Sequence, residues 1–285
     1  MVKPIKRVLL KHPKEAYQNQ KKINDESLNL KYLANPNFNK GCTDYDQFTR
    51  VLESFNCEIN YLPLNNNSSI DSIYTHDPCI ISNKGVILSK MGKSQRESES
   101  FEIKKFFESV NIPILGQIES PGILEGGDVV WINEKTVAVG EGYRTNKEGI
   151  LQLKAILGDL IHEIISVPLP HWTGSNDCLH LMSNLSPIDT NLFLVYSRLL
   201  PVPFRKYLIQ KKITLIEVPD EEYASMGCNV LAIRPRKVLM MEGNPITKKR
   251  LEAYNVDVHV YDGTEISLKG SGGPTCLTRP FYRAD

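Results

Sequence analysis

Apolar and amphipathic stretches alternate along this chain in an order that recurs. Residues 79–91 contain two apolar stretches around an Asn-Lys-Gly turn, which predicts a β-hairpin. An amphipathic helix is predicted over 95–110 and a strand over 113–116. The same order then occurs three more times, with hairpins at 128–139, 179–196 and 229–241, helices at 147–157, 203–211 and 247–254, and strands at 163–167, 214–218 and 256–261.

The two ends of the chain supply a fifth unit. Residues 7–12 and 59–64 are predicted strands on either side of a helical pattern at 44–55. The fifth hairpin would begin at Cys276 and close with the N-terminal strands. The polar segment 13–39, rich in Asn, Lys and Gln, is expected to be a surface excursion, for which a lid is one use.

A period of about 50 residues in such units predicts a closed array of similar modules instead of two separate domains. Radial repetition also protects the edges of the sheets, which a chain rich in hairpins has to do in some way. The expected fold is therefore a single α/β propeller of five modules over residues 1–285.

Composition narrows the class of protein. The 285 residues are 41% hydrophobic, which allows a sizeable core, and the 34 basic and 33 acidic residues nearly cancel. No global field would recruit nucleic acid or an acidic membrane surface. The chain starts directly with a predicted strand and has no run of about 18 apolar residues, so neither a leader peptide nor a membrane span is expected. We expect a cytoplasmic protein, monomeric or homo-oligomeric, without nucleic acid or membrane partners.

The six cysteines lie far apart and show no spacing typical of a zinc site. In so long a chain this pattern indicates reduced thiols, and no metal or other cofactor is expected. Five of them are interpreted as structural thiols: Cys42, Cys57, Cys79, Cys178 and Cys228.

One polar residue leads into each hairpin, and we call these five the lead residues: Asp77, Glu125, His180, Asn229 and Cys276. Successive lead residues are about 50 positions apart, so in a closed array they would form a ring around one end of the axis. Two carboxylates, an imidazole, an amide and a thiol would then meet in one concave site. Any one of them could simply begin a strand, but five in five modules favour a site.

This set of side chains limits the chemistry. A thiolate attacks an electrophilic carbon, an imidazole relays protons, and carboxylates hold a cation. A guanidinium suits all three, because it is a planar cation whose donors match carboxylates and it has an electrophilic central carbon.

Four motifs resemble the guanidino-group modifying superfamily, which includes arginine deiminases, dimethylarginine dimethylaminohydrolases and amidinotransferases. They are LEGGD at 124–128, YRTN at 143–146, CLHL at 178–181 and GGPTC at 272–276. The length is similar to that of the compact dimethylarginine hydrolases. The resemblance implies a five-module α/β propeller, the pentein fold.

The resemblance also implies roles for single residues. Cys276 would be the nucleophile that forms a thiouronium adduct, and His180 the general acid and base. Glu125 would orient the site, and Asp77 would bind the guanidinium.

Further residues are candidates for substrate binding. By resemblance, Arg144 and Arg96 would bind a substrate carboxylate, and Asp71 matches another acid of the substrate pocket. His76 is added because it adjoins the lead residue Asp77, and Asn229 because it is itself a lead residue.

Three positions depart from the family pattern. Met182 stands where deiminases and amidinotransferases carry a second guanidinium-binding Asp, and a thioether could instead face a methyl group. His76 stands where the dimethylarginine hydrolases have Glu and the deiminases Arg, and Ser271 replaces an acid. Met182 favours an N-alkylated or otherwise altered guanidine over free arginine, and the other two positions leave the identity of the substrate open.

The function predicted from the sequence is a hydrolase of arginine or an N-substituted arginine, which releases citrulline or an analogue together with an amine or ammonia. The alternatives are an amidinotransferase, which would pass the amidino group to an acceptor amine, and an arginine deiminase or dihydrolase. A catalytically silent propeller that binds a partner is the alternative outside enzymes, since ribosome anti-association factors share this fold.

Overall fold

The computed structural model describes residues 1–175 and 179–284, and it contains five three-stranded sheets. In each sheet the first two strands pair antiparallel and the third pairs parallel to the middle one. The sheets are β3 (Cys79–Ile81), β4 (Val86–Leu88) and β5 (Ile114–Gln117); β6 (Val129–Asn133), β7 (Thr136–Glu141) and β8 (Glu163–Pro168); β9 (Leu185–Asp189), β10 (Leu192–Val195) and β11 (Thr214–Glu217); β12 (Val230–Arg234), β13 (Lys237–Met241) and β14 (Asp257–Tyr261); β15 (Arg279–Arg283), β1 (Ile5–Leu10) and β2 (Glu58–Tyr61).

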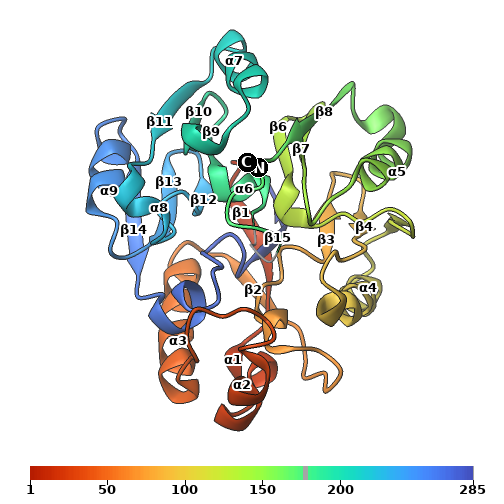
Figure 1. The fold of residues 1–285 in the computed structure, drawn as a ribbon, viewed down its shortest axis with the longest axis vertical. Coiled ribbons are helices and arrows are strands. Elements are labelled where there is room, and N and C mark those ends of the chain that lie inside the picture. Colours follow the sequence, from red (N-terminus) through yellow and green to blue (C-terminus); the bar gives the residue numbers. More distant parts are fainter. Residues whose placement is uncertain (176–178, 285) are drawn as a thin grey trace.

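A helix connects the middle and third strand of every sheet. These helices are α4 (Glu97–Ser109), α5 (Lys147–Leu157), α7 (Val202–Gln210), α9 (Pro245–Glu252) and α3 (Phe38–Glu53). Figure 1 shows the five sheets spread around the middle of the molecule with these helices at the periphery. The repeat of hairpin, helix and strand predicted from the sequence is therefore confirmed, including the hairpin between the two ends of the chain.

The middle strands carry the clearest sequence signal. Strands β4 and β10, with the sequences VIL and LFLV, are buried at every residue. A strand that is paired on both sides and covered by a helix exposes no face to water, so its sequence is a continuous apolar run and does not alternate.

Each pair of neighbouring sheets shares one apolar cluster. Ile80 packs with Val137, Val130 with Phe193, and Leu194 with Val238 in three of these clusters. The other two clusters join β1 to its neighbours on either side, through Leu239 of β13 and Val86 of β4. The core is thus divided among five interfaces between sheets.

Some elements differ from the prediction. The third hairpin begins at Leu185 and not at 179, because α6 (Leu181–Asn184) forms one helical turn first. The segment 13–39 contains α1 (Pro13–Ala16) and α2 (Gln20–Glu26), and it buries Tyr17 and Ile23. It is therefore a packed part of the molecule and not a wholly superficial excursion. The remaining short helices are α8 (Asp220–Tyr223), η1 (Ile70–Ile73), η2 (Ser94–Arg96), η3 (Gly126–Asp128), η4 (Gly158–Leu160), η5 (Ser197–Leu199) and the π-helical η6 (Thr264–Leu268).

Among the described residues, no helix combines the length and the apolar character needed to cross a membrane.

Candidate active site

The lead residues all lie just before the first strand of a sheet. Asp77 precedes β3, Glu125 precedes η3 and β6, and His180 precedes α6 and β9. Asn229 comes directly before β12, and Cys276 three residues before β15. Three of these side chains, Asp77, Glu125 and His180, have atoms within 4.8 Å of one another, and Asn229 lies 3.2 Å from the Cys276 thiol.

His180 lies between two carboxylates. Its Nε2 is 2.9 Å from Glu125 Oε2, and its Nδ1 is 3.9 Å from Asp77 Oδ1. All three residues are buried, with Glu125 at 0% exposure. This arrangement holds the imidazole in one orientation.

Gly127 is required by this packing. Its N–H donates to Asp77 Oδ1 at 3.1 Å. A Cβ atom at this position would lie 2.5 Å from His180 Nδ1 and 2.8 Å from Asp77 Oδ1. Only glycine lets the backbone come this close, which explains the glycines of the LEGGD motif.

Glu125 is neutralised by Arg144. The Arg144 Nε donates to Glu125 Oε1 at 3.0 Å, and Nη2 lies 2.8 Å from Oε2. The N–H of Gly92 adds a third donor at 2.8 Å. Burial alone would raise the pKa of Glu125, but Arg144 and His180 together lower it to about 2. The carboxylate is therefore ionised over the whole physiological range.

Asp77 is neutralised in the same way by Arg96, whose Nη1 donates to Asp77 Oδ2 at 2.6 Å. Burial would raise the pKa of Asp77, but His180 and Arg96 outweigh it and lower that pKa. Arg96 is 2% exposed and also binds Glu99 through Nε and Nη2 and the carbonyl oxygen of Tyr74 through Nη2. Its guanidinium thus has protein acceptors on three sides, and the predicted contact of Arg96 with a substrate carboxylate stays a prediction.

Cys276 is half-buried and faces Asn229, which comes from the neighbouring sheet. Asn229 Nδ2 donates to Cys276 Sγ at 3.2 Å, and its Oδ1 accepts from the N–H of Thr275 at 3.1 Å. A Cβ atom at Gly273 would lie 2.5 Å from Asn229 Cγ, so glycine is needed for this contact. The amide therefore holds the thiol and the loop that carries it.

His76 connects the thiol to the carboxylate cluster. Its N–H donates to the carbonyl oxygen of Cys276 at 3.2 Å, and its ring Nδ1 is 2.9 Å from the carbonyl oxygen of Thr278. Burial, and next the charge of Arg279, lower the pKa of His76 to about 3, so the ring is neutral. With Nδ1 as the donor, Nε2 is a buried acceptor for which residues 1–175 and 179–284 supply no hydrogen-bond donor.

Asp71 lies in η1, one turn before this cluster, and is buried. Lys93 Nζ donates to Asp71 Oδ2 at 2.5 Å and to the carbonyl oxygen of Leu30 at 2.8 Å. Lys93 thereby ties the 13–39 segment to the predicted substrate pocket.

Met182 belongs to the apolar cluster of β6, β7, β9 and β10 and is 5% exposed. Its predicted contact with a substrate methyl group stays a prediction.

Of the cysteines interpreted as structural, Cys57, Cys79 and Cys228 are buried and Cys42 is half-buried, whereas Cys178 lies outside the described residues. Burial raises the pKa of Cys79 to about 11, which suits an inert thiol.

Several polar residues at the site were not predicted from the sequence. Glu99 pairs with Arg96, and burial raises its pKa to about 7. Asp128 accepts from Thr145 Oγ1 at 2.7 Å and from the N–H of Leu181 at 2.9 Å. Asp128 and Thr145 stand inside the LEGGD and YRTN motifs, which is a usable signal. Glu99, Lys93 and Arg279 had no signal of this kind.

Asp77, Glu125 and His180 offer ligand atoms within 4.8 Å of one another, which is close enough for a metal ion. Both carboxylates, however, are already paired with arginines, and a cation would have to displace Arg96 and Arg144. The donor set therefore fits a charge-paired acid–base cluster better than a metal centre.

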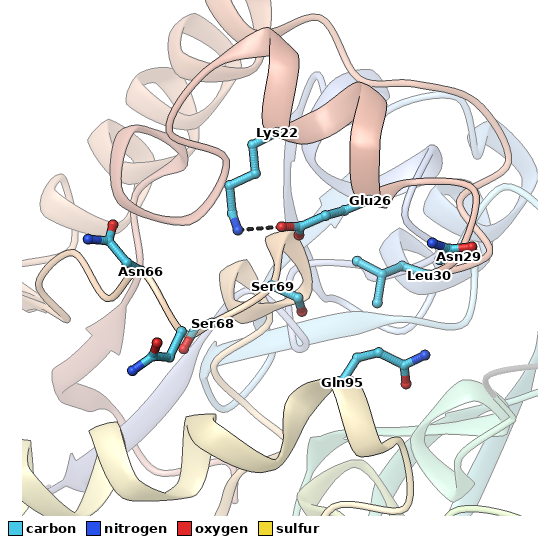
Figure 2. Close-up of a pocket in the computed structure, with 9 residues that line it drawn as sticks. Lys22, Glu26, Asn29, Leu30, Asn66, Ser68, Ser69 and Gln95 are labelled. Carbon is cyan, nitrogen blue, oxygen red and sulfur yellow. Dashed lines mark hydrogen bonds and ion pairs between the residues drawn. The ribbon is translucent and has the colours of Figure 1, made fainter.

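A cavity of about 270 Å³ lies outside the ring of lead residues (Figure 2). It is open and lies between α2 on one side and the 66–69 loop on the other, with Gln95 below, and most of the residues that line it have polar side chains. No lead residue lines it. The described site is accordingly defined by converging side chains and not by this cavity.

Comparison with known proteins agrees with this geometry. A family model described as arginine deiminase matches residues 62–203 and 200–283. The protein YkgA of Bacillus subtilis (strain 168) is 28% identical over 94% of this chain and 86% of its own. The N(G),N(G)-dimethylarginine dimethylaminohydrolase of Pseudomonas aeruginosa is 26% identical over 90% of this chain and 94% of its own. The arginine deiminase of Listeria welshimeri is 26% identical, and the matched part spans 61% of its length.

Solved structures show the same fold. A mutant of the Pseudomonas aeruginosa dimethylarginine dimethylaminohydrolase in complex with citrulline has a TM-score of 0.79 at 24% identity, covering 98% of this chain and 100% of that one. The N-terminal domain of ArgZ, a cyanobacterial arginine dihydrolase, has a TM-score of 0.80 at 18% identity and covers 98% of both chains.

Fold and site together define the class, which is the guanidino-group modifying superfamily, as the sequence motifs had indicated. Since the family model spans most of the sequence, the chain belongs to the arginine deiminase family.

Proposed function

We propose that this protein hydrolyses the guanidinium group of arginine or of an N-substituted arginine, giving citrulline or its analogue and ammonia or an amine. Family membership makes it an amidine-hydrolysing enzyme. Its relatives are a dimethylarginine dimethylaminohydrolase and arginine deiminases, and a related fold binds citrulline.

One observation carries the proposal for this chain. His180 lies 2.9 Å from one ionised carboxylate and 3.9 Å from another, and His76, next to Asp77, donates its N–H at 3.2 Å to the carbonyl oxygen of the half-buried Cys276. Acid–base catalysis at a planar cation needs this combination of nucleophile, proton carrier and anionic support.

The residues would act in two steps. Cys276 thiolate attacks the guanidinium carbon while Asp77 and Glu125 stabilise the cation, and a C–S bond forms. His180 then donates a proton to the leaving nitrogen, the C–N bond breaks, and a thiouronium adduct remains. In the second step His180 takes a proton from water, the hydroxide adds to the same carbon, and the thiolate leaves.

Substrate recognition is assigned to residues around this centre. Arg144 and Arg96 are proposed to bind a carboxylate of the substrate, and Asp71 an ammonium. In each case the substrate would replace a side chain of the protein. This side chain is Glu125 for Arg144, Glu99 for Arg96 and Lys93 for Asp71. The neutral His76 and the amide of Asn229 offer further hydrogen bonds.

The proposed architecture is one α/β propeller of five modules over residues 1–285. The apolar clusters support this architecture. Each sheet shares a cluster with the next one along the chain, and the sheet of β1 shares one cluster with the sheet of β13 and another with the sheet of β4. The 13–39 segment would act as a lid over the ring.

The test is a mass-spectrometric end-point assay on a panel of guanidines: arginine, monomethylarginine, asymmetric dimethylarginine, agmatine and guanidino acids, each with and without glycine. Citrulline with a methylamine would identify a dimethylarginine-type hydrolase, and citrulline with ammonia from arginine a deiminase. Amidino transfer to glycine would contradict hydrolysis and identify an amidinotransferase.

Cys276→Ser is the matched variant. The serine hydroxyl is a far weaker nucleophile at neutral pH, so turnover should fall by at least about 10³-fold while the melting temperature stays within a few degrees. Full activity in this variant would contradict the assignment of the nucleophile. No turnover of any guanidine by the wild type would favour the silent binding module.

A further inference from the structure

Arg279 is a buried cation that the proposed mechanism does not use. It begins β15, three residues after Cys276, and is 7% exposed. Its Nη2 donates to the carbonyl oxygen of His76, and its Nε is buried without a partner. Within residues 1–175 and 179–284, no carboxylate forms an ion pair with it.

Burying an arginine without a carboxylate costs free energy, because the guanidinium loses its hydration and the hydrogen bonds of the protein replace only part of it. Methionine or leucine would fill the same volume with no such cost. A purely structural role therefore does not explain the charge.

The surroundings of Arg279 connect it to the nucleophile through one residue, His76. The His76 carbonyl oxygen accepts from Arg279, and the His76 N–H donates to the carbonyl oxygen of Cys276 at 3.2 Å. The His76 ring is bonded to Thr278, which lies between the two. The backbone of His76 thus holds the 276–279 turn at both of its ends.

The same guanidinium lies close under the carboxylate cluster. A Cβ atom at Gly126 would be 2.5 Å from Arg279 Nη2, and one at Gly127 would be 2.8 Å from Asp77 Oδ1. Two consecutive glycines therefore separate Arg279 from the face on which Asp77 and His180 meet.

The amide of Asn229, before β12, contacts the Cys276 thiol at 3.2 Å. Tyr74 after η1, Tyr261 at the end of β14 and Arg279 of β15 also interact electrostatically with Cys276. Burial raises the pKa of both phenols, so they remain neutral, whereas Arg279 brings a positive charge.

We infer that Arg279 is a positioning residue for the nucleophile: its buried charge favours the thiolate of Cys276, and its bond to His76 fixes the loop that carries the thiol. The inference rests on the proposed function in taking Cys276 as the nucleophile. It predicts a thiol that is ionised at lower pH than it would be without Arg279.

The experiment compares Arg279→Met, Arg279→Gln and Arg279→Lys with the wild type. The ionisation of Cys276 is followed by the ultraviolet absorbance of the thiolate against pH, and the signal of the same variant carrying Cys276→Ser is subtracted. Arg234→Met, at an exposed arginine, controls for the change in net charge. Methionine and glutamine should raise the midpoint by about one pH unit or more, and lysine should largely preserve it.

Activity gives a second readout. In Arg279→Met the acid limb of kcat/KM should move to higher pH with the thiol, while KM changes little, and kcat/KM at pH 7 should fall roughly tenfold. If Arg279→Met does not fold, the glutamine and lysine variants decide the matter. Equal midpoints in all folded variants would overturn the inference. The titration needs no substrate, so its outcome is separate from whether the guanidine panel reveals turnover.

Discussion

Charge pairing dominates this site at the residue scale. Arg96 joins Asp77 to Glu99, and Arg144 covers Glu125, so that each buried carboxylate of the cluster has a cation beside it. Buried charges are tolerated only when they are paired and hydrogen-bonded. A guanidinium substrate that enters such a site exchanges with an existing partner instead of meeting bare anions.

Asp128 is a buried acid that, among the described residues, is hydrogen-bonded to Thr145 and Leu181 and forms no ion pair with an arginine or lysine, and it gives a pH-dependent prediction. Burial raises its pKa from 3.8 to about 6. Folding therefore favours the protonated form, and this contribution to stability is present below about pH 3.8 and is lost as the pH rises through about 6. Asparagine cannot ionise. The free energy of unfolding of Asp128→Asn should therefore rise relative to that of the wild type as the pH rises, by up to about 3 kcal/mol at pH 7.

Urea unfolding at several pH values between 4 and 7 measures this difference. Asp159→Asn, at an exposed acid in η4, is the matched control and should show no such trend. A constant difference between Asp128→Asn and the wild type would contradict the protonation assigned to Asp128.

At the scale of elements, the side chain of Lys93, at the start of η2, joins the 13–39 segment to η1. Lys93 binds the carbonyl oxygen of Leu30 and the carboxylate of Asp71. The N–H of Leu33 donates to the carbonyl oxygen of Lys269 at 2.7 Å, which ties the same segment to the loop before Cys276. A lid that opens would have to break these contacts first.

Lys93→Met should loosen the segment. Loss of two hydrogen bonds from a charged donor costs about 1–3 kcal/mol, so local opening should become about tenfold more frequent or more. Hydrogen–deuterium exchange of peptides from 27–37 would measure it, with Lys84→Met, in an exposed turn, as the control. Unchanged exchange in Lys93→Met would show that Lys93 does not hold the segment.

At the scale of the whole molecule, the two ends of the chain complete one sheet. Strand β15 pairs antiparallel with β1, and the N–H of Ala284 donates to the carbonyl oxygen of Pro4 at 3.1 Å. Figure 1 shows the two termini together near the middle of the molecule. The fifth sheet thus forms only when the ends of the chain meet.

Joining the ends should therefore be tolerated. A circular permutant with a short Gly-Ser linker between the termini, opened between Asn83 and Lys84 in the β3–β4 turn, should fold and melt within a few degrees of the wild type. The control is the chain opened at the same place without a linker, as two co-expressed fragments, which should be less stable. A permutant that is unfolded while the fragments assemble would contradict the role of β15–β1 pairing.

Much of the fold could be predicted because it depends on short-range patterns. The buried middle strands appear as apolar runs, and the turns carry Gly, Asn or Pro, so the first, second and fourth hairpins and the helices after all four hairpins were placed closely. The third hairpin begins at Leu185 and not at 179. Turn α6 was missed, because its sequence LMSN continues the apolar run that leads into β9. Helices α1 and α2 were missed because polar residues hide the few apolar positions, such as Tyr17 and Ile23, that anchor them.

The sequence by itself determined the repeat and the chemical types of the lead residues, because both depend on residue identity and spacing along the chain. Which charges pair was decided only by the tertiary structure. Arg96 was predicted to bind a substrate carboxylate, and its pairing with Asp77 and Glu99 had no signal in the sequence; Arg279 had none either. The physical reason is that pairing depends on burial and on distances between side chains far apart in sequence, and these exist only once the five sheets have packed together.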